Sequence, residues 1–217
     1  VHKYPDWARE IKNIYDTWKD LHIVFTGSSV TDILRQHADL SRRVVRYELP
    51  GLSFREYLAF GKIIDHSPLQ LAEIFRSHAL LAAELTRTFQ PLKHLRDYLQ
   101  FGYYPFFAEN RKTYHIRLEQ VVKMIIETDL RYIEGFDGSN IRKVYQLLYI
   151  LATNVPFKPN ITALSAKTGI HRNTLVQYLQ HLERARLVNL LYPAGNSIST
   201  LQKPGKIYLE NTNLQFA

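Results

Sequence analysis

The spacing of apolar residues predicts that most of this chain is helical. In several stretches apolar residues recur every three or four positions, which is the period of a helix with one buried face. Proline, glycine and polar clusters separate these stretches. The predicted helices are Trp7–Lys19, Pro68–Phe75, Leu80–Phe89, Leu92–Phe101, Leu118–Leu130, Ile141–Thr153, Ile161–Thr168 and Arg172–Ala185.

Two short apolar runs near the start of the chain differ from this pattern. Leu21–Thr26 and Val44–Leu49 are too short for helices, and their composition is typical of buried parallel strands. The first run ends in a tight turn at Gly27–Ser29. Ser53, with Glu56 three residues later, is the signature of a helix that starts after the second run. This order predicts part of an α/β unit, with too few strands for a complete sheet.

The last third of the chain has another order of elements. Asn160 is expected to cap a short helix, and Gly169–His171 makes a tight turn before a longer one. The strands Leu187–Tyr192 and Lys206–Glu210 follow the longer helix. Three helices followed by a β-ribbon is the order of a winged helix-turn-helix.

The composition limits the chemistry that the chain can carry. It has no cysteine, which excludes disulfides, thiolate zinc sites and cysteine nucleophiles and suits a reducing cytoplasm, the expected location. No apolar run approaches the ~20 residues of a membrane span, so no membrane partner is expected. The nine histidines lack paired ligand spacing, so no metal site is expected in this chain.

Positive charge gathers toward the end of the chain. The formal net charge is +8. Residues 141–217 carry nine of the 28 Lys and Arg but two of the 20 Asp and Glu, whereas the preceding residues are nearly balanced. A basic segment next to a neutral one indicates a nucleic-acid footprint, although a solvated basic surface would give the same counts.

The chain lacks a phosphate-binding loop. The pairs Gly61-Lys62 and Gly205-Lys206 do not have the glycine that the motif requires five residues earlier. The metalloprotease and nucleophile-elbow motifs are absent as well. Because the chain starts on Val1 rather than methionine and both of its ends look cut, we expect a fragment of a longer protein.

Five segments, in order along the chain, resemble a family of prokaryotic AAA-type ATPases. Residues 2–16 resemble the stretch after that family's Walker B carboxylates, and residues 23–29 resemble its sensor-1 strand. Leu40-Ser41-Arg42-Arg43 is similar to its Leu-Ser-Gly-Arg. Residues 52–58 are similar to its Leu-Ser-Phe-Arg-Glu-Phe signature, and residues 98–105 to its Tyr-Leu-x-x-Gly-Gly-x-Pro element. The remainder resembles the DUF4143 type of C-terminal domain.

The resemblance implies that the intact protein binds and hydrolyses ATP with Mg²⁺. It places the Walker A lysine and the Walker B carboxylates before Val1, so this chain alone is expected to be inactive. Ser28 or Ser29 would orient the attacking water, and Arg43 would approach a γ-phosphate on a neighbouring subunit. Self-association through the ATPase domains is therefore expected. Two plainer interpretations stay open, namely Ser28 as a helix cap and Arg43 as a surface residue.

The expected fold is mainly α with an α/β remnant. Residues 1–60 would be the C-terminal part of an AAA-type α/β core, residues 61–137 a helical lid or linker, and residues 138–217 a winged-helix domain. Arg42 departs from the family's pattern, because glycine usually stands at that position.

The long helix that starts at Arg172 is the expected DNA-reading element. Its apolar side chains are spaced to pack inward, and its outer face carries side chains of the types that read base edges in the major groove. Residues on the ribbon would meet phosphates. Double-stranded DNA is thus the expected partner; the alternative is a nucleotide-independent winged-helix module that binds DNA or protein. The inward residues are Leu175, Tyr178, Leu179 and Leu182, and the candidate DNA contacts are Arg172, Asn173, Gln177, Arg184, Lys203 and Lys206.

Overall fold

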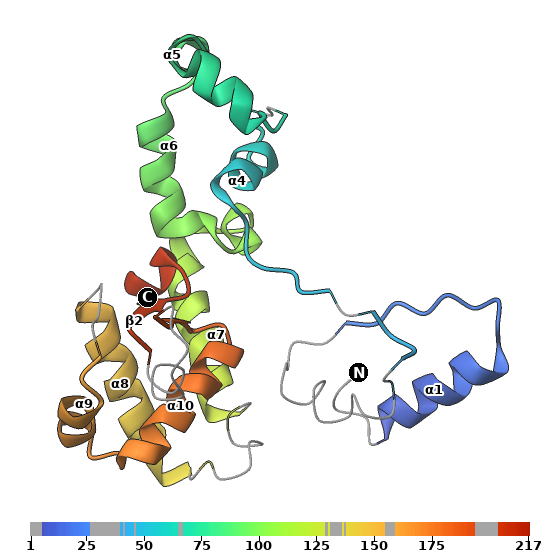
Figure 1. Ribbon diagram of the computed structural model, residues 1–217, viewed down its shortest axis with the longest axis vertical. Helices are drawn as coiled ribbons and strands as arrows, with labels where there is room; N and C mark the ends of the chain where they lie inside the picture. The colour runs from blue at the N-terminus through green and yellow to red at the C-terminus, as the bar shows by residue number, and fades with distance from the viewer. Residues whose placement is uncertain are drawn as a thin grey trace. The chain divides into compact units, whose positions relative to one another are not determined.

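The computed structural model describes residues 6–26, 40, 42–45, 47–64, 67–128, 130, 136, 138–154, 159–193 and 204–217. These residues are mostly helical and contain one antiparallel sheet of two strands (Figure 1), which confirms the mainly α character. The chain divides into two compact units. Unit 1 comprises residues 1–48 and 120–210, and unit 2 comprises residues 49–119 and 211–217. The three predicted domains stay a prediction.

The first helix of unit 1, α1 (Trp7–Thr17), is covered only where it begins. Trp7 and Ala8 are buried together with Leu40, and Ile11, Phe25 and Val44 pack against these three residues. The predicted apolar side continues along the helix, but its later members Ile14, Tyr15 and Trp18 are 40, 42 and 65% exposed. The apolar side of α1 therefore extends beyond the core that covers its start.

The two strands that the sequence predicts near the start of the chain do not form among the described residues. Residues 21–26 and 47–49 have no strand structure. Val24, Tyr47 and Leu49 are 92, 88 and 98% exposed. A strand needs a neighbour to pair its N–H and C=O groups, and in the described part of the chain neither run has one. The predicted turn at Gly27–Ser29 lies outside the described residues.

The later part of unit 1 follows the predicted order. Helices α8 and α9 begin and end at the predicted residues, and the ribbon pairs Val188 with Leu209 and Leu191 with Lys206. Among the apolar positions of α8, Val144, Leu147 and Leu151 are buried. The elements are α7 (Tyr114–Glu127, which starts in unit 2), η5 (Gly138–Asn140), α8 (Ile141–Thr153), α9 (Ile161–Thr168), α10 (Arg172–Arg184), β1 (Val188–Leu191) and β2 (Lys206–Leu209).

Unit 2 agrees with the prediction in one place and differs in another. The break predicted between Pro68–Phe75 and Leu80–Phe89 falls at Ser77, whose φ of −134° and ψ of 18° are not helical and kink the span α5 (Leu71–Thr88). The stretch predicted as one helix, Leu92–Phe101, changes from α to π geometry at Tyr98. The elements are α4 (Phe54–Phe60), α5 (Leu71–Thr88), α6 (Pro91–Asp97), the π-helix η1 (Tyr98–Gly102), η2 (Pro105–Ala108), η3 (Arg111–Thr113) and η6 (Thr212–Gln215).

The predicted cap of α4 is confirmed atom by atom. The Ser53 hydroxyl accepts a hydrogen bond from the backbone N–H of Glu56, at 3.3 Å. The Glu56 carboxylate in turn accepts from the backbone N–H of Ser53, at 2.7 Å, which completes a reciprocal capping box. These hydrogen bonds lower the pKa of Glu56, so the cap is ionised at neutral pH.

The two signature segments of unit 2, residues 52–58 and 98–105, pack on each other. Tyr57 and Tyr98 have ring centroids 5.6 Å apart, and the Tyr98 hydroxyl donates to the Leu52 carbonyl at 2.8 Å. Gly102 allows this approach, because a Cβ there would lie 2.4 Å from the Tyr98 ring and 2.8 Å from the Tyr57 ring. The motif residues thus carry an aromatic core.

A buried amide, that of Asn213, holds the end of the chain on the π-helix. Asn213 is 0% exposed, and its side chain has partners at both ends. Its Oδ1 accepts from the backbone N–H of Tyr103, at 2.9 Å, and from the hydroxyl of Tyr114. Its Nδ2 donates to the carbonyls of Tyr98 and Leu99, at 3.1 and 2.8 Å. These partners are about a hundred positions away in sequence, so the amide joins the last segment of the chain to the rest of unit 2.

We expect Tyr114→Phe to lower the free energy of unfolding by about 1–2 kcal/mol, because it leaves part of a buried amide without its partner. Tyr178→Phe is the matched control. The Tyr178 hydroxyl is buried and has no hydrogen-bond partner among the described residues, so its removal should leave the stability unchanged or raise it slightly. Urea denaturation of the two variants measures both effects, and equal losses would contradict this account of the Asn213 amide.

Candidate functional site

The turn between α9 and α10 sets where the long helix begins. Gly169 ends α9 in the left-handed conformation, with φ of 64°. The Ser165 hydroxyl donates to the Ile170 carbonyl at 2.6 Å, and the Thr168 hydroxyl donates to the Leu164 carbonyl at 2.8 Å. The Ser165 hydrogen bond spans the turn and the Thr168 hydrogen bond lies within α9, while Gly169 supplies a backbone conformation that other residues adopt at a cost.

Two side chains of α8 also hold this turn. Lys143 donates from Nζ to the Gly169 carbonyl at 3.1 Å. Gln146 donates from Nε2 to the Lys167 carbonyl at 3.2 Å. The last carbonyls of a helix lack partners within the helix, so both contacts cap the C-terminus of α9. The sequence pattern did not predict the roles of Lys143, Gln146 and Ser165, because a polar residue near a helix that ends in glycine is a weak signal.

Helix α10 separates an apolar face from a polar one. The predicted inward residues Leu175, Tyr178, Leu179 and Leu182 are all buried, as expected. The candidate contacts Arg172, Asn173, Gln177 and Arg184 are all exposed. α8, α9 and α10 lie side by side in Figure 1, and α9 contacts both other helices. The four predicted side chains of α10 therefore all lie on the surface of this helix.

The ribbon carries one more candidate residue. Lys206 is exposed at the start of β2, opposite Leu191, and the next residue, Ile207, is fully buried. This alternation of exposed and buried positions is what a strand with one covered face shows. Lys203 lies outside the described residues.

The exposed cations of this part are available to a partner. In the stretches that the structure describes, Arg172, Arg184 and Lys206 form no ion pair with an acidic side chain. The acid of α10, Glu183, accepts a hydrogen bond from the backbone N–H of Leu190 at 3.1 Å. Burial, and secondarily the charge of Arg184, lowers the pKa of His181, so the positive charge of α10 at pH 7 comes from its arginines.

Arg43 is paired with an acid on α1. Its Nε donates to Oδ1 of Asp16 at 3.0 Å, and its Nη2 donates to Oδ2 at 3.1 Å. This fork lowers the pKa of Asp16 and raises that of Arg43. The neighbouring Arg42 has φ of 73°, a conformation that favours glycine, which is the residue that the resembled family has there. Ser28 and Ser29 lie outside the described residues.

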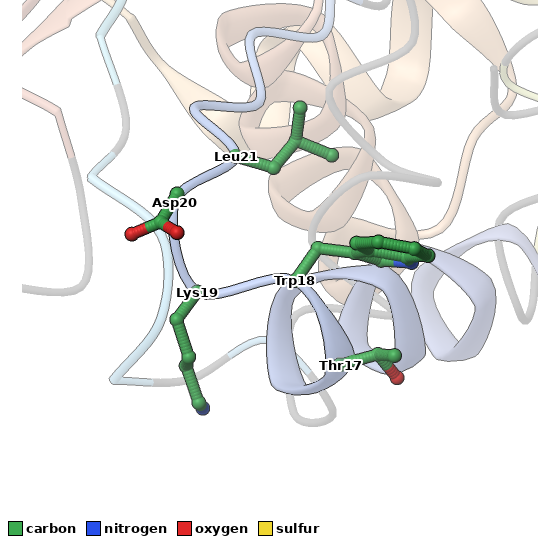
Figure 2. A pocket seen from close by; sticks show the side chains of 5 residues that line it. All are labelled: Thr17, Trp18, Lys19, Asp20 and Leu21. Atoms are coloured by element: carbon green, nitrogen blue, oxygen red, sulfur yellow. The ribbon is translucent and has the colours of Figure 1, made fainter.

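A surface hollow at the end of α1 is lined by the consecutive residues Thr17–Leu21 (Figure 2). In that view Trp18 and Leu21 extend to one side of the backbone, and Asp20 extends to the other. The hollow is open, and its polar groups do not converge on one point. We therefore assign no binding role to it. Among the described residues, no group of three or more potential metal-ligating side chains occurs, and no helix could cross a membrane.

Two protein families match parts of the chain. A family described as an AAA domain matches residues 1–58, which supports the AAA-type resemblance of the first segments. A family described as a domain of unknown function, DUF8612, matches residues 92–215. The second match corrects the expected DUF4143 type.

One curated relative is the uncharacterized protein MJ1637 of Methanocaldococcus jannaschii. It is 28% identical over 205 residues, which cover 93% of this chain and 43% of the relative. The chain thus spans less than half the length of that relative. No solved structure matches the chain.

The turn before α10 yields a stability prediction. Gly169→Ala places a Cβ at φ of 64°, and we expect it to lower the free energy of unfolding by about 1 kcal/mol. Gly138→Ala is the control, because a Cβ there meets nothing within 4 Å and its φ is not positive. That variant should be as stable as the parent or slightly more so. If thermal unfolding shows the same change for both, the left-handed turn does not constrain α10.

Proposed function

We propose that this chain is the C-terminal part of an AAA-type ATPase. The chain belongs to the DUF8612 family, and its residues 1–58 match an AAA domain. Its last residues, 138–217, form a winged-helix domain that contacts double-stranded DNA. The relative of more than twice the matched length is consistent with a longer protein, in which nucleotide hydrolysis and DNA contact belong to different parts.

Two apolar runs that join no sheet in the described part of the chain carry the ATPase half of the proposal. Residues 21–26 and 47–49 belong to the segment that matches the AAA domain; they form neither helix nor strand, and most of them are exposed. Exposed apolar strand-like segments are unfavourable in a finished domain, because both their side chains and their backbone groups need cover. Parallel strands and helices from the preceding part of an α/β core would supply that cover.

ATP and Mg²⁺ would be held mainly by residues that precede this chain. The chain has no phosphate-loop motif, so no cradle of backbone N–H groups for the phosphates is expected from it. Arg43 fits a supporting role, since its guanidinium is partly exposed and carries a positive charge that can stabilise a γ-phosphate during transfer. Ser28 and Ser29 are proposed to orient the water. If Arg43 acts on a neighbouring subunit, the ATPase domains must self-associate.

The order of elements carries the winged-helix half of the proposal. Three helices, α8, α9 and α10, precede the antiparallel ribbon β1–β2, as in a winged helix-turn-helix. In the helix-turn-helix pair α9–α10 the recognition helix would be α10, and Arg172, Asn173 and Gln177 on its first turns would meet base edges in the major groove. Arg184, Lys203 and Lys206 would meet phosphates, with a salt-dependent contribution to affinity.

The ATPase proposal predicts the effect of Arg43→Ala in the longer protein. Turnover should fall at least about tenfold while ATP affinity changes little, because such an arginine acts on the transition state. Steady-state hydrolysis and calorimetry with Mg-ATP separate the two quantities. The 217-residue chain by itself should bind no Mg-ATP; a micromolar dissociation constant for it, or unchanged turnover in Arg43→Ala, would refute these roles.

The DNA proposal can be tested on the 217-residue chain. In anisotropy titrations with mixed-sequence duplex DNA at two salt concentrations, Arg172→Ala and Lys206→Ala should each weaken binding about tenfold. The Lys206 change should also flatten the salt dependence by about one unit of slope. Arg87→Ala, which removes the same charge from the exposed helix α5 of unit 2, should have no effect. If the parent chain does not bind even at low salt, the DNA proposal is wrong, and the domain is a protein-interaction or purely structural element.

A further inference from the structure

We infer that Asp16 is a positioning residue for Arg43, holding the guanidinium in the orientation in which it serves phosphoryl transfer. This inference rests on the proposed ATPase function. It goes beyond that function because nothing in the sequence pattern marks Asp16, which lies on α1, 27 positions before the arginine.

The geometry of the contact leaves part of the guanidinium available. The fork engages Nε and Nη2, at 3.0 and 3.1 Å from the two carboxylate oxygens of Asp16. An arginine has five N–H donors, so among the described residues both donors of Nη1 and one of Nη2 remain beyond this fork. A bidentate pair also fixes the plane of the guanidinium, which a single hydrogen bond would not do. The free edge of Arg43 therefore has a defined direction away from Asp16.

The Asp16 carboxylate lies on helix α1, whose start packs on a small core. The start of α1 is anchored by Trp7 and Ala8, which are buried with Leu40. Leu40 belongs to the same turn as Arg43, since the Arg43 backbone N–H donates to the Leu40 carbonyl at 3.0 Å. One small core thus contacts both the start of the helix that carries the acid and the turn that carries the arginine. This is the arrangement that precise placement of a charged group requires.

A purely stabilising role fits the pair less well. The side chains of Arg43 and Asp16 are 31 and 40% exposed, and partly exposed ion pairs add little to folding stability. The arginine lowers the pKa of Asp16, so the acid stays charged and the fork stays formed at neutral pH. An arginine side chain without a partner samples many rotamers, and the entropy of these rotamers is lost when the side chain binds a phosphate. The pair with Asp16 restricts the rotamers of Arg43 in advance.

The test uses the longer protein and its ATPase activity. Asp16→Asn should lower kcat at least about fivefold with KM for ATP unchanged, because the amide offers one acceptor where the carboxylate offers two charged ones. Asp16→Glu should restore part of the loss. Asp20→Asn, which removes the same charge four residues later at an exposed position, should leave kcat unchanged. In the Arg43→Ala background, Asp16→Asn should cause no further loss.

The outcomes separate this inference from the proposed function. If Arg43→Ala lowers turnover and Asp16→Asn does not, the positioning role is wrong and the ATPase role of Arg43 stands. If Asp16→Asn lowers kcat only together with the unfolding temperature, and Asp16→Glu rescues neither, Asp16 is a structural residue. If the longer protein hydrolyses no ATP, or Arg43→Ala is as active as the parent, both the inference and the proposed function fall.

Discussion

The buried amide of Asn213 is the interaction on which unit 2 depends. An amide that is fully out of water must have partners for its oxygen and its nitrogen, and the loss of one costs more than an ordinary surface hydrogen bond contributes. Asn213 finds four such partners on residues 98–114, two of them carbonyls of the π-helix. The same π-helix places Tyr98 against Tyr57 of α4. The last residues of the chain, the π-helix and the first signature segment are therefore joined through one side chain.

Two parts of unit 1 differ in how far their polar groups are hydrogen-bonded and their apolar groups covered. At the turn between α9 and α10 the backbone carbonyls have side-chain partners, since Lys143 and Gln146 cap the end of α9 and Ser165 bonds across the turn. Near the start of the chain the apolar runs have no sheet partner in the described part, and Phe25 and Val44 pack on a small core while Val24, Tyr47 and Leu49 stay exposed. The first part is a finished module that can present a surface. The second leaves large apolar side chains such as Val24 and Leu49 exposed, and this contrast underlies the division of the proposed function between nucleotide and DNA.

The sequence predicted those features that depend on local periodicity. The bounds of α8 and α9, the cap by Asn160 and the capping box of Ser53 and Glu56 follow from residues within one or two turns of each other. The strands at residues 21–26 and 44–49 were wrong for this chain because strand formation depends on a partner, which composition does not report. The π-helix, the Asn213 contacts and the Asp16–Arg43 fork were missed, since each is decided by residues far apart in sequence. For the site, the exposed face of α10 could be predicted, and the side chains that hold its turn could not.

The central claim is that residues 1–58 are part of an ATPase core whose remaining strands precede this chain. Amide hydrogen exchange, followed at residues 21–26 and 47–49, tests it most directly, because paired strand amides exchange slowly and unpaired ones do not. The account predicts fast exchange at these amides in the 217-residue chain and strong protection in the longer protein. Equal protection in both would mean that the runs find their partners within this chain, and fast exchange in both would mean that they are not strands of a core.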